Sequence, residues 1–119
     1  KCYMSTTGSD SNDGTSSGNP VLTLNKCLTI FSPNGAGAYP ATIYVESGVY
    51  IGAQNVGLDI SLAGYVNIIG SSDAYPYATF SGQSSTWCWS VASSLNVSSV
   101  SFEGCFGGVL VLGASRLHV

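Results

Sequence analysis

The residues best suited to bind a metal ion lie in one short stretch, Asp10-Ser11-Asn12-Asp13-Gly14. Carboxylate and amide oxygens are the ligands that Ca²⁺ prefers. An EF-hand loop needs a glutamate at its twelfth position, which counted from Asp10 is Val21, so an EF-hand is excluded. We expect Asp10, Asn12 and Asp13 to form Asx turns with their own backbone. A calcium site of another geometry, built from the same three side chains, is the alternative.

Residues that could perform acid–base catalysis are few and scattered. Hydrolysis of a glycosidic bond needs two carboxyl groups close together, and a lyase needs a base near the proton that it removes. Beyond the N-terminal region, the carboxylates fall in separate expected strands and loops: Glu46, Asp59, Asp73 and Glu103. Arg116 is the one basic residue there, and His118, the one histidine, forms no Ser/His/Asp triad. We predict that the chain is not an enzyme; an active site beyond Val119 is the alternative.

Aromatic side chains offer a third kind of site, because their flat rings can stack on the faces of sugars. Trp87 and Trp89 lie on one face of an expected strand. They either pack in the core or against another subunit, or they bind carbohydrate. Tyr75 and Tyr77 flank a proline in an expected turn and form a more exposed patch. The candidate carbohydrate-binding residues are therefore Trp87, Trp89, Tyr75 and Tyr77, with the tyrosines at positions 39, 44, 50 and 65 as further aromatic groups.

The four cysteines, Cys2, Cys27, Cys88 and Cys105, show no CxxC spacing, which disfavours a zinc site. Three pairings are open to four cysteines. We expect Cys2–Cys27 and Cys88–Cys105, because each of these pairs closes a short loop; four reduced thiols are the alternative. Asn96-Val97-Ser98 is a sequon, so Asn96 is a candidate glycosylation site if the protein is secreted.

The composition indicates a polar but nearly uncharged surface. Of the 119 residues, 45% are hydrophobic and only 8% are charged, and the formal net charge is −3. Three basic residues form no patch that could neutralise phosphates, so we predict no nucleic-acid binding. No apolar run reaches the roughly 18 residues of a membrane helix, so we predict no membrane insertion. Scarce charge and the even number of cysteines favour an extracellular or cell-surface location.

One helix is expected near the N-terminus, after a first strand at residues 2–5. Asn19 and Pro20 have the residue types of an N-cap and a first helical position. Apolar residues then recur at helical spacing, and the Ser32–Gly35 segment ends the helix after about three turns. These apolar residues are Leu24, Cys27, Leu28 and Phe31.

The rest of the chain predicts short strands separated by Gly, Ser, Asn and Asp. They are expected at residues 42–45, 48–52, 58–62, 65–70, 78–82, 87–91, 95–102 and 108–113. Without helices between the strands, a doubly wound sheet is excluded, and a sandwich or a solenoid remains. A shift of 22 positions places Trp87–Val97 on Val109–Val119, with Ala92, Ser93, Leu95 and Val97 repeated. A period of this length favours the solenoid.

The order of the motifs resembles the N-terminal segment of the right-handed parallel β-helix superfamily, which includes pectate-lyase-like proteins and surface proteins with polymorphic outer-membrane-type repeats. The motifs are Gly8-Ser9-Asp10-Ser11-Asn12-Asp13-Gly14-Thr15, Asn19-Pro20, Ile43-Tyr44-Val45-Glu46-Ser47-Gly48-Val49-Tyr50 and Ile69-Gly70. The resemblance implies a helix that covers the first coil, held to the first strand by a Cys2–Cys27 disulfide.

Together these observations predict an all-β, right-handed parallel β-helix (solenoid) with one N-terminal capping α-helix. The chain would be one module: first strand, polar loop and cap in residues 1–35, coils in residues 41–119, with truncation at the C-terminus. The expected function is that of a non-enzymatic secreted or cell-surface element, adhesive, coat or fibre, which self-associates into filaments. The alternatives are a fragment of a polysaccharide lyase or hydrolase, and a carbohydrate-binding module.

Overall fold

The computed structural model describes residues 1–31, 41–52, 54–60, 66–71, 77–82, 89–91, 94–104, 109–111 and 116–118. For 109–111 and 116–118 the description covers the course of the backbone alone. The elements are β1 (Cys2–Met4), α1 (Leu24–Ile30), β2 (Ala41–Val45), β3 (Val49–Tyr50), β4 (Leu58–Ile60), β5 (Val66–Gly70), β6 (Thr79–Ser81), β7 (Trp89–Val91), β8 (Ser94–Ser98), β9 (Ser101–Glu103), β10 (Val109–Val111) and β11 (Arg116–His118).

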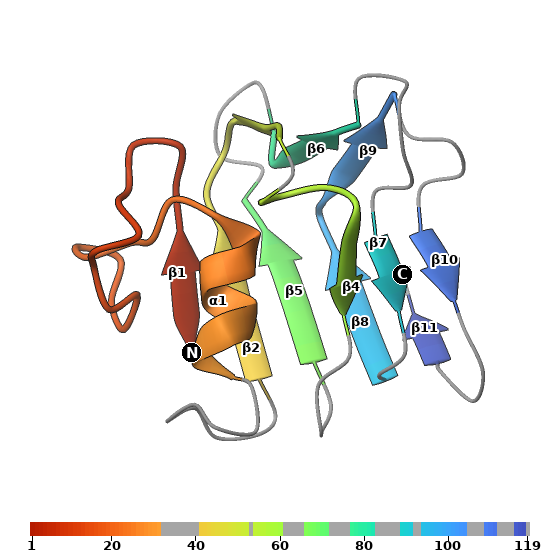
Figure 1. The fold of residues 1–119 in the computed structure, drawn as a ribbon, viewed down its shortest axis with the longest axis horizontal. Helices are drawn as coiled ribbons and strands as arrows, with labels where there is room; N and C mark the ends of the chain where they lie inside the picture. The colour runs from red at the N-terminus through yellow and green to blue at the C-terminus, as the bar shows by residue number, and fades with distance from the viewer. Residues whose placement is uncertain are drawn as a thin grey trace.

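The strands form three sheets, and every pairing is parallel. The largest sheet has the order β1-β2-β5-β8-β11; the two smaller ones are β10-β7-β4 and β3-β6-β9. Strands that follow one another in the chain mostly lie in different sheets, so hydrogen-bonded neighbours are distant in sequence. In Figure 1, α1 and β4 lie in front of the five-stranded sheet.

The structure corrects the expected fold class. An all-β right-handed parallel β-helix, or solenoid, with a capping helix was expected, but the described residues form three open sheets and one short helix around a common core. In this part of the chain no sheet closes on itself, and the strands have only two to five residues. We therefore describe the protein as a small mixed fold of parallel sheets and one helix.

Alternation along the strands of the five-stranded sheet separates a core side from a solvent side. Register stacks one core residue from each strand: Cys2 pairs with Ile43, Ile43 with Ile68, and Ile68 with Val97. All four are at most 1% exposed. Within each of these strands, the residues next to a core residue point outward, as the predicted two-residue period requires.

The core beneath the smaller sheets is aromatic. Tyr50 stacks on Phe80, with ring centroids 5.2 Å apart, and Trp89 meets both Phe80 and Phe102 edge-on. Asn55 joins this cluster to the helix: its carbonyl accepts from the indole Nε1 of Trp89, and its side-chain Oδ1 accepts from the backbone N–H of Leu24. The side-chain amide is satisfied on both sides, because its Nδ2 also donates to the backbone carbonyl of Ile51.

The helix begins later than the sequence predicts. Thr23, not Asn19, is the N-cap, and its hydroxyl accepts from the N–H of Lys26. The preceding residues are extended because the backbone of Val21 pairs with β1: its N–H donates to Tyr3, and its carbonyl accepts from Ser5. The apolar face is as predicted, since Leu24, Cys27, Leu28 and Phe31 are all buried. The segment expected to end the helix lies outside the described residues.

The strand expected at residues 95–102 is two strands, β8 and β9, in different sheets. The chain turns at Ser99, whose φ of 58° is rare for a residue other than glycine. Gly70 makes this corner possible, because a Cβ at position 70 would collide with the carbonyl oxygen of Ser99.

The predicted 22-residue repeat is only half correct. Leu95 pairs with Leu117, as the repeat requires. Trp89, however, pairs with Val109 rather than Val111. The stretch between β10 and β11 is two residues longer than that between β7 and β8, which restores the register at Leu117.

Candidate functional site

The N-terminal loop uses its carboxylates to organise itself. Asp10 accepts three hydrogen bonds: from the N–H groups of Leu22 and Thr23 to Oδ1, and from the Thr23 hydroxyl to Oδ2. Asn12 donates its side-chain amide to the carbonyl of Pro20. Asp13 accepts from the N–H and the hydroxyl of Thr15. Each of the three predicted calcium ligands is thus bonded to a different part of the loop.

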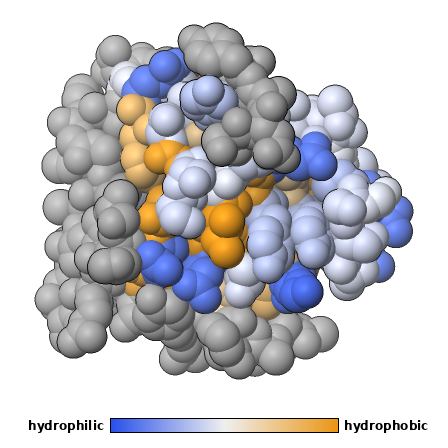
Figure 2. Space-filling model, turned by 180° about the vertical axis from the view of Figure 1, so that it is seen from behind, coloured by the Kyte–Doolittle hydropathy of each residue, from blue (hydrophilic) through white to orange (hydrophobic). Residues whose placement is uncertain are grey.

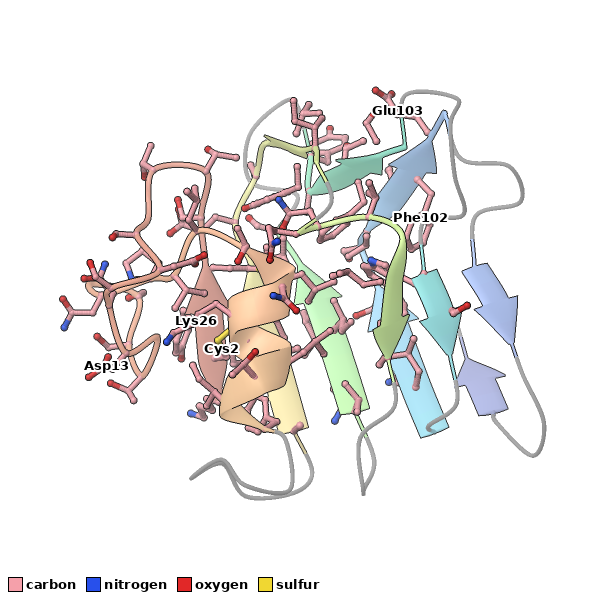
Figure 3. All side chains as sticks on the ribbon, viewed as in Figure 1. Cys2, Asp13, Lys26, Phe102 and Glu103 are labelled. Atoms are coloured by element: carbon pink, nitrogen blue, oxygen red, sulfur yellow. A yellow bond between two sulfur atoms is a disulfide. The ribbon has the colours of Figure 1, made fainter. Side chains whose placement is uncertain are left out.

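These bonds lower the pKa of Asp13, because the N–H and hydroxyl of Thr15 stabilise its charged form. Figure 3 places Asp13 at the outer end of the loop, on the opposite side of the molecule from Glu103. Among the described residues no group of three His, Cys, Asp or Glu side chains could hold a metal ion. Calcium binding by Asp10, Asn12 and Asp13 stays a prediction. The expected Asx turn is present at Asp13, which bonds the N–H two residues on, but not at Asp10 or Asn12, whose partners lie eight to thirteen positions away.

The disulfide Cys2–Cys27 is present and joins β1 to α1. Both cysteines are fully buried, and the yellow bond beside the helix in Figure 3 marks their position. The expected partners Cys88 and Cys105 lie outside the described residues.

The aromatic candidates for carbohydrate binding differ in their exposure to solvent. Trp89 is fully buried among the core rings, so it cannot contact a sugar at the surface. Of the alternatives for Trp89, packing in the core is therefore the correct one. Tyr77 is 47% exposed and remains accessible. Trp87 and Tyr75 lie outside the described residues.

Catalytic carboxylates are not brought together by the described structure. Glu46 follows β2, whereas Glu103 ends β9 in another sheet. Only the backbone of Asp59 is described, in β4, and Asp73 lies outside the described residues. α1, the helix of the described chain, is too short to cross a membrane.

The solvent side of the five-stranded sheet carries two ladders of aligned side chains. One ladder consists of Tyr3, Tyr44, Ile69 and Ser98, and the other of Thr42, Asn67 and Asn96. We call these seven residues the outer face. These seven residues include no Asp, Glu, Lys or Arg. The fifth strand, β11, continues the second ladder with His118 and aligns Arg116 with Ser94, and only the backbone of β11 is described. Figure 2, which views the molecule from behind, shows an apolar group near the middle of this side with polar residues around it.

Contacts within each ladder fix the side chains of the outer face. The rings of Tyr3 and Tyr44 stack with centroids 4.8 Å apart and planes inclined by 16°. The amide of Asn96 donates to Oδ1 of Asn67 at 3.3 Å. Asn96, the predicted glycosylation site, is therefore half-buried in a strand, and a glycan on it would stand on the outer face.

A hollow of about 200 Å³ adjoins the tyrosine pair. We call it the tyrosine hollow. Its walls combine aromatic, aliphatic, hydroxyl and carboxylate groups, a mixture typical of sites that bind polar ligands through a few oriented contacts. The lining residues are Tyr3, Ser17, Tyr44, Val45, Glu46, Ile69, Gly70 and Ser71.

A second hollow, of about 310 Å³, lies between the N-terminal loop and β3. Three of its lining residues are apolar and 40–50% exposed: Leu22, Val49 and Ile51. Tyr50 also lines this hollow, and its hydroxyl donates to the carbonyl of Glu46. Burial raises the pKa of Tyr50, and the negative charge of Glu46 adds to the effect.

Sequence reasoning did not single out Tyr3 and Tyr44 as a pair. Their alternation with buried residues places both on the outer side, but their contact depends on the register of β1 against β2. The comparisons with protein-family models, with curated proteins and with solved structures find no match to the chain, so the family resemblance stays a prediction from its motifs.

Proposed function

We propose that the protein is a non-enzymatic structural element of the cell surface or the extracellular space, which adheres through its outer face. One observation carries the proposal: seven side chains from four parallel strands form two ordered ladders without a charged group. Such a surface can contact an extended partner without desolvating ions, which is costly.

The described carboxylates support a structural role. Asp10 and Asp13 are bonded within the N-terminal loop, and Glu46 is the single carboxylate among the described residues that line the tyrosine hollow. Two carboxylates are needed for the common mechanism of glycoside hydrolysis. The disulfide between Cys2 and Cys27 supports an oxidising environment.

Neutral polysaccharides fit the outer face better than anionic polymers do. Tyrosine and isoleucine side chains pack against C–H groups, and the amides of Asn67 and Asn96 can hydrogen-bond to hydroxyls. The nearest hollow contributes Glu46, which would repel uronates and phosphates. The exposed Tyr77 offers a competing site on another part of the surface.

Self-association is the second part of the proposal, and the two ends of the five-stranded sheet differ in this respect. The outer edge of β1 is covered, because Tyr3 bonds to Gly14 and Val21 and Ser5 bonds to Val21. At the other end of this sheet, β11 is the last strand among the described residues, and β9 and β10 are likewise the last described strands of the two smaller sheets. Edge strands pair readily with another chain.

We propose that two copies associate through β9, β10 and β11. A contact in which both copies use the same edges closes as a dimer, whereas a filament would require displacement of the loop that covers β1. Mass photometry over a range of concentrations tests this point. Dimers are expected, filaments would show that the loop moves, and a monomer at all concentrations would refute self-association.

Adhesion is tested with particles of a neutral polysaccharide, a polyuronate and a coating protein, using periplasmic protein that has disulfides but no glycans. Ile69→Lys places a charge on the outer face, and Val49→Lys does so at a similarly exposed residue elsewhere, 42% against 37% exposed. We expect Ile69→Lys to reduce binding about tenfold or more and Val49→Lys to leave it unchanged. Equal effects would refute the outer face, and release of new reducing ends would refute a non-enzymatic role.

A further inference from the structure

Tyr3 and Tyr44 lie in a geometry that has a chemical consequence independent of adhesion. They occupy paired positions on neighbouring parallel strands, and their rings stack with centroids 4.8 Å apart. Both rings are partly exposed and line the tyrosine hollow. The planes of the two rings are inclined by only 16°, so one ring faces the other.

We propose that Tyr3 and Tyr44 are the site of an intramolecular dityrosine cross-link, formed by a peroxidase with hydrogen peroxide. Each phenol loses one electron and one proton to give a phenoxyl radical. The two radicals form one carbon–carbon bond between the ring positions beside the hydroxyls, and the hydrogens on those carbons move to the oxygens. The two electrons and two protons reduce one hydrogen peroxide molecule to two water molecules.

Proximity favours coupling within the pair. Two groups held side by side react with a high effective concentration, whereas coupling between molecules depends on diffusion. Among the described residues the other stacked tyrosine is Tyr50, which is 2% exposed and faces Phe80, a side chain with no phenolic hydroxyl. On its other side, Tyr44 is followed in the ladder by Ile69, which cannot couple. A radical on Tyr44 therefore has Tyr3 as its partner in the ladder.

The cross-link would fix β1 to β2 from the solvent side. Cys2, the neighbour of Tyr3, already fixes β1 to α1 from the core side through its disulfide with Cys27. A covalent bond between residues 3 and 44 closes a long loop of the unfolded chain and so lowers its entropy. An oxidised protein would thus resist unfolding more than the unmodified protein does.

The experiment treats dilute folded protein with a peroxidase and limiting hydrogen peroxide. Wild type is compared with Tyr3→Phe, Tyr44→Phe and the control Tyr77→Phe, each checked for native circular dichroism. The expected product is a monomer that has lost two hydrogen atoms, has dityrosine fluorescence and yields a Tyr3–Tyr44 cross-linked peptide. We expect the yield of this monomer to fall about tenfold or more in Tyr3→Phe and Tyr44→Phe, and to be unchanged in Tyr77→Phe.

Three results would overturn the proposal. The first is a folded wild type in which only dimers carry dityrosine. The second is a cross-linked peptide that joins other tyrosines. The third is an undiminished yield of cross-linked monomer in Tyr44→Phe. None of these results bears on adhesion, which is measured without an oxidant, so the two proposals fail separately.

Discussion

Asp10 is the residue on which the N-terminal loop depends most. It holds the N–H groups of Leu22 and Thr23 and the Thr23 hydroxyl, and Thr23 in turn caps α1. The side chain therefore orients the N-cap from outside the helix. The sequence places Asp10 in a turn, but it does not reveal that the bonded residues lie twelve and thirteen positions away.

We expect Asp10→Ala to lower the free energy of unfolding by about 1–2 kcal/mol, because the helix loses its oriented cap. Urea denaturation followed by circular dichroism measures the change. Asp13→Ala is the matched control, since Asp13 is a carboxylate of the same loop whose side-chain partner among the described residues is Thr15, not the helix cap. Equal losses in both variants would contradict the role assigned to Asp10.

Gly70 is required by the close approach of β5 to the corner between β8 and β9. We expect Gly70→Ala to lower the free energy of unfolding by about 2–4 kcal/mol, because the added Cβ meets backbone rather than a flexible side chain. Gly18→Ala is the control, because the nearest atom to its added Cβ would be Ser16 Oγ at 3.9 Å. Thermal unfolding measures both variants. Equal unfolding temperatures for Gly70→Ala and Gly18→Ala would show that the corner at Ser99 moves to accommodate the added Cβ.

Tyr50 predicts a loss of stability at alkaline pH. Its ordinary pKa is 10.0, and burial and Glu46 raise that value in the folded protein. Above pH 10 the unfolded chain therefore releases a proton that the folded chain keeps, so stability falls with pH, by up to about 1.4 kcal/mol per pH unit.

The variant Tyr50→Phe removes this dependence, and the hydroxyl's bond to Glu46 with it. We expect the variant to be less stable at pH 7 by about 1 kcal/mol. The difference from wild type should shrink as the pH rises above 10. Parallel curves of unfolding free energy against pH would contradict a raised pKa for Tyr50.

At the scale of elements, periodicity predicts most strands but not their corners. β2 and β5 lie where alternating residues place them, and α1 buries its predicted apolar face. Ser98 and Ser99 are of a type that also separates strands, but neither glycine nor proline marks that corner, so the sequence predicts one strand where the structure has β8 and β9. The helix start was misplaced because pairing of Val21 with β1, a tertiary contact, overrides the local signal of Asn19 and Pro20.

Register is the part of the candidate site that sequence could not supply. Ile43 pairs with Ile68 and Ile68 pairs with Val97, so the spacing between partners changes from one strand to the next. A single repeat length therefore cannot predict that Tyr3 meets Tyr44. Alternation along each strand predicts which tyrosine, asparagine and isoleucine side chains lie on the outer side. The lengths of the loops between strands determine which of these side chains are neighbours.

The disulfide is the main covalent link between α1 and the sheet. We expect replacement of Cys2 and Cys27 by alanine to lower the free energy of unfolding by about 2–4 kcal/mol. Substitution is preferable to a reducing agent, which would also act on the other two cysteines. Denaturation of the double variant with urea measures the loss, and an unchanged midpoint would show that core packing alone holds α1 in place.

At the scale of the whole molecule, the outer face lies on one side of the five-stranded sheet, and the edge strands β9, β10 and β11 lie at one end of the three sheets. The charged side chains of the N-terminal loop serve that loop, and the outer face is free of charge. This division explains how a chain with only 8% charged residues presents an ordered surface without a catalytic cluster among its described residues. Adhesion through the outer face is the property that these features of the whole molecule support.

Hydroxyl-radical footprinting shows whether the outer face is the surface that contacts the polysaccharide. Oxidation of each side chain is measured by mass spectrometry in the free protein and in protein bound to neutral polysaccharide particles. We expect Tyr3, Tyr44 and Ile69 to lose reactivity on binding, while Val49, Ile51 and Tyr77 keep theirs. Protection of Tyr77 or of the Val49–Ile51 region, with Tyr44 and Ile69 unchanged, would contradict adhesion through the outer face.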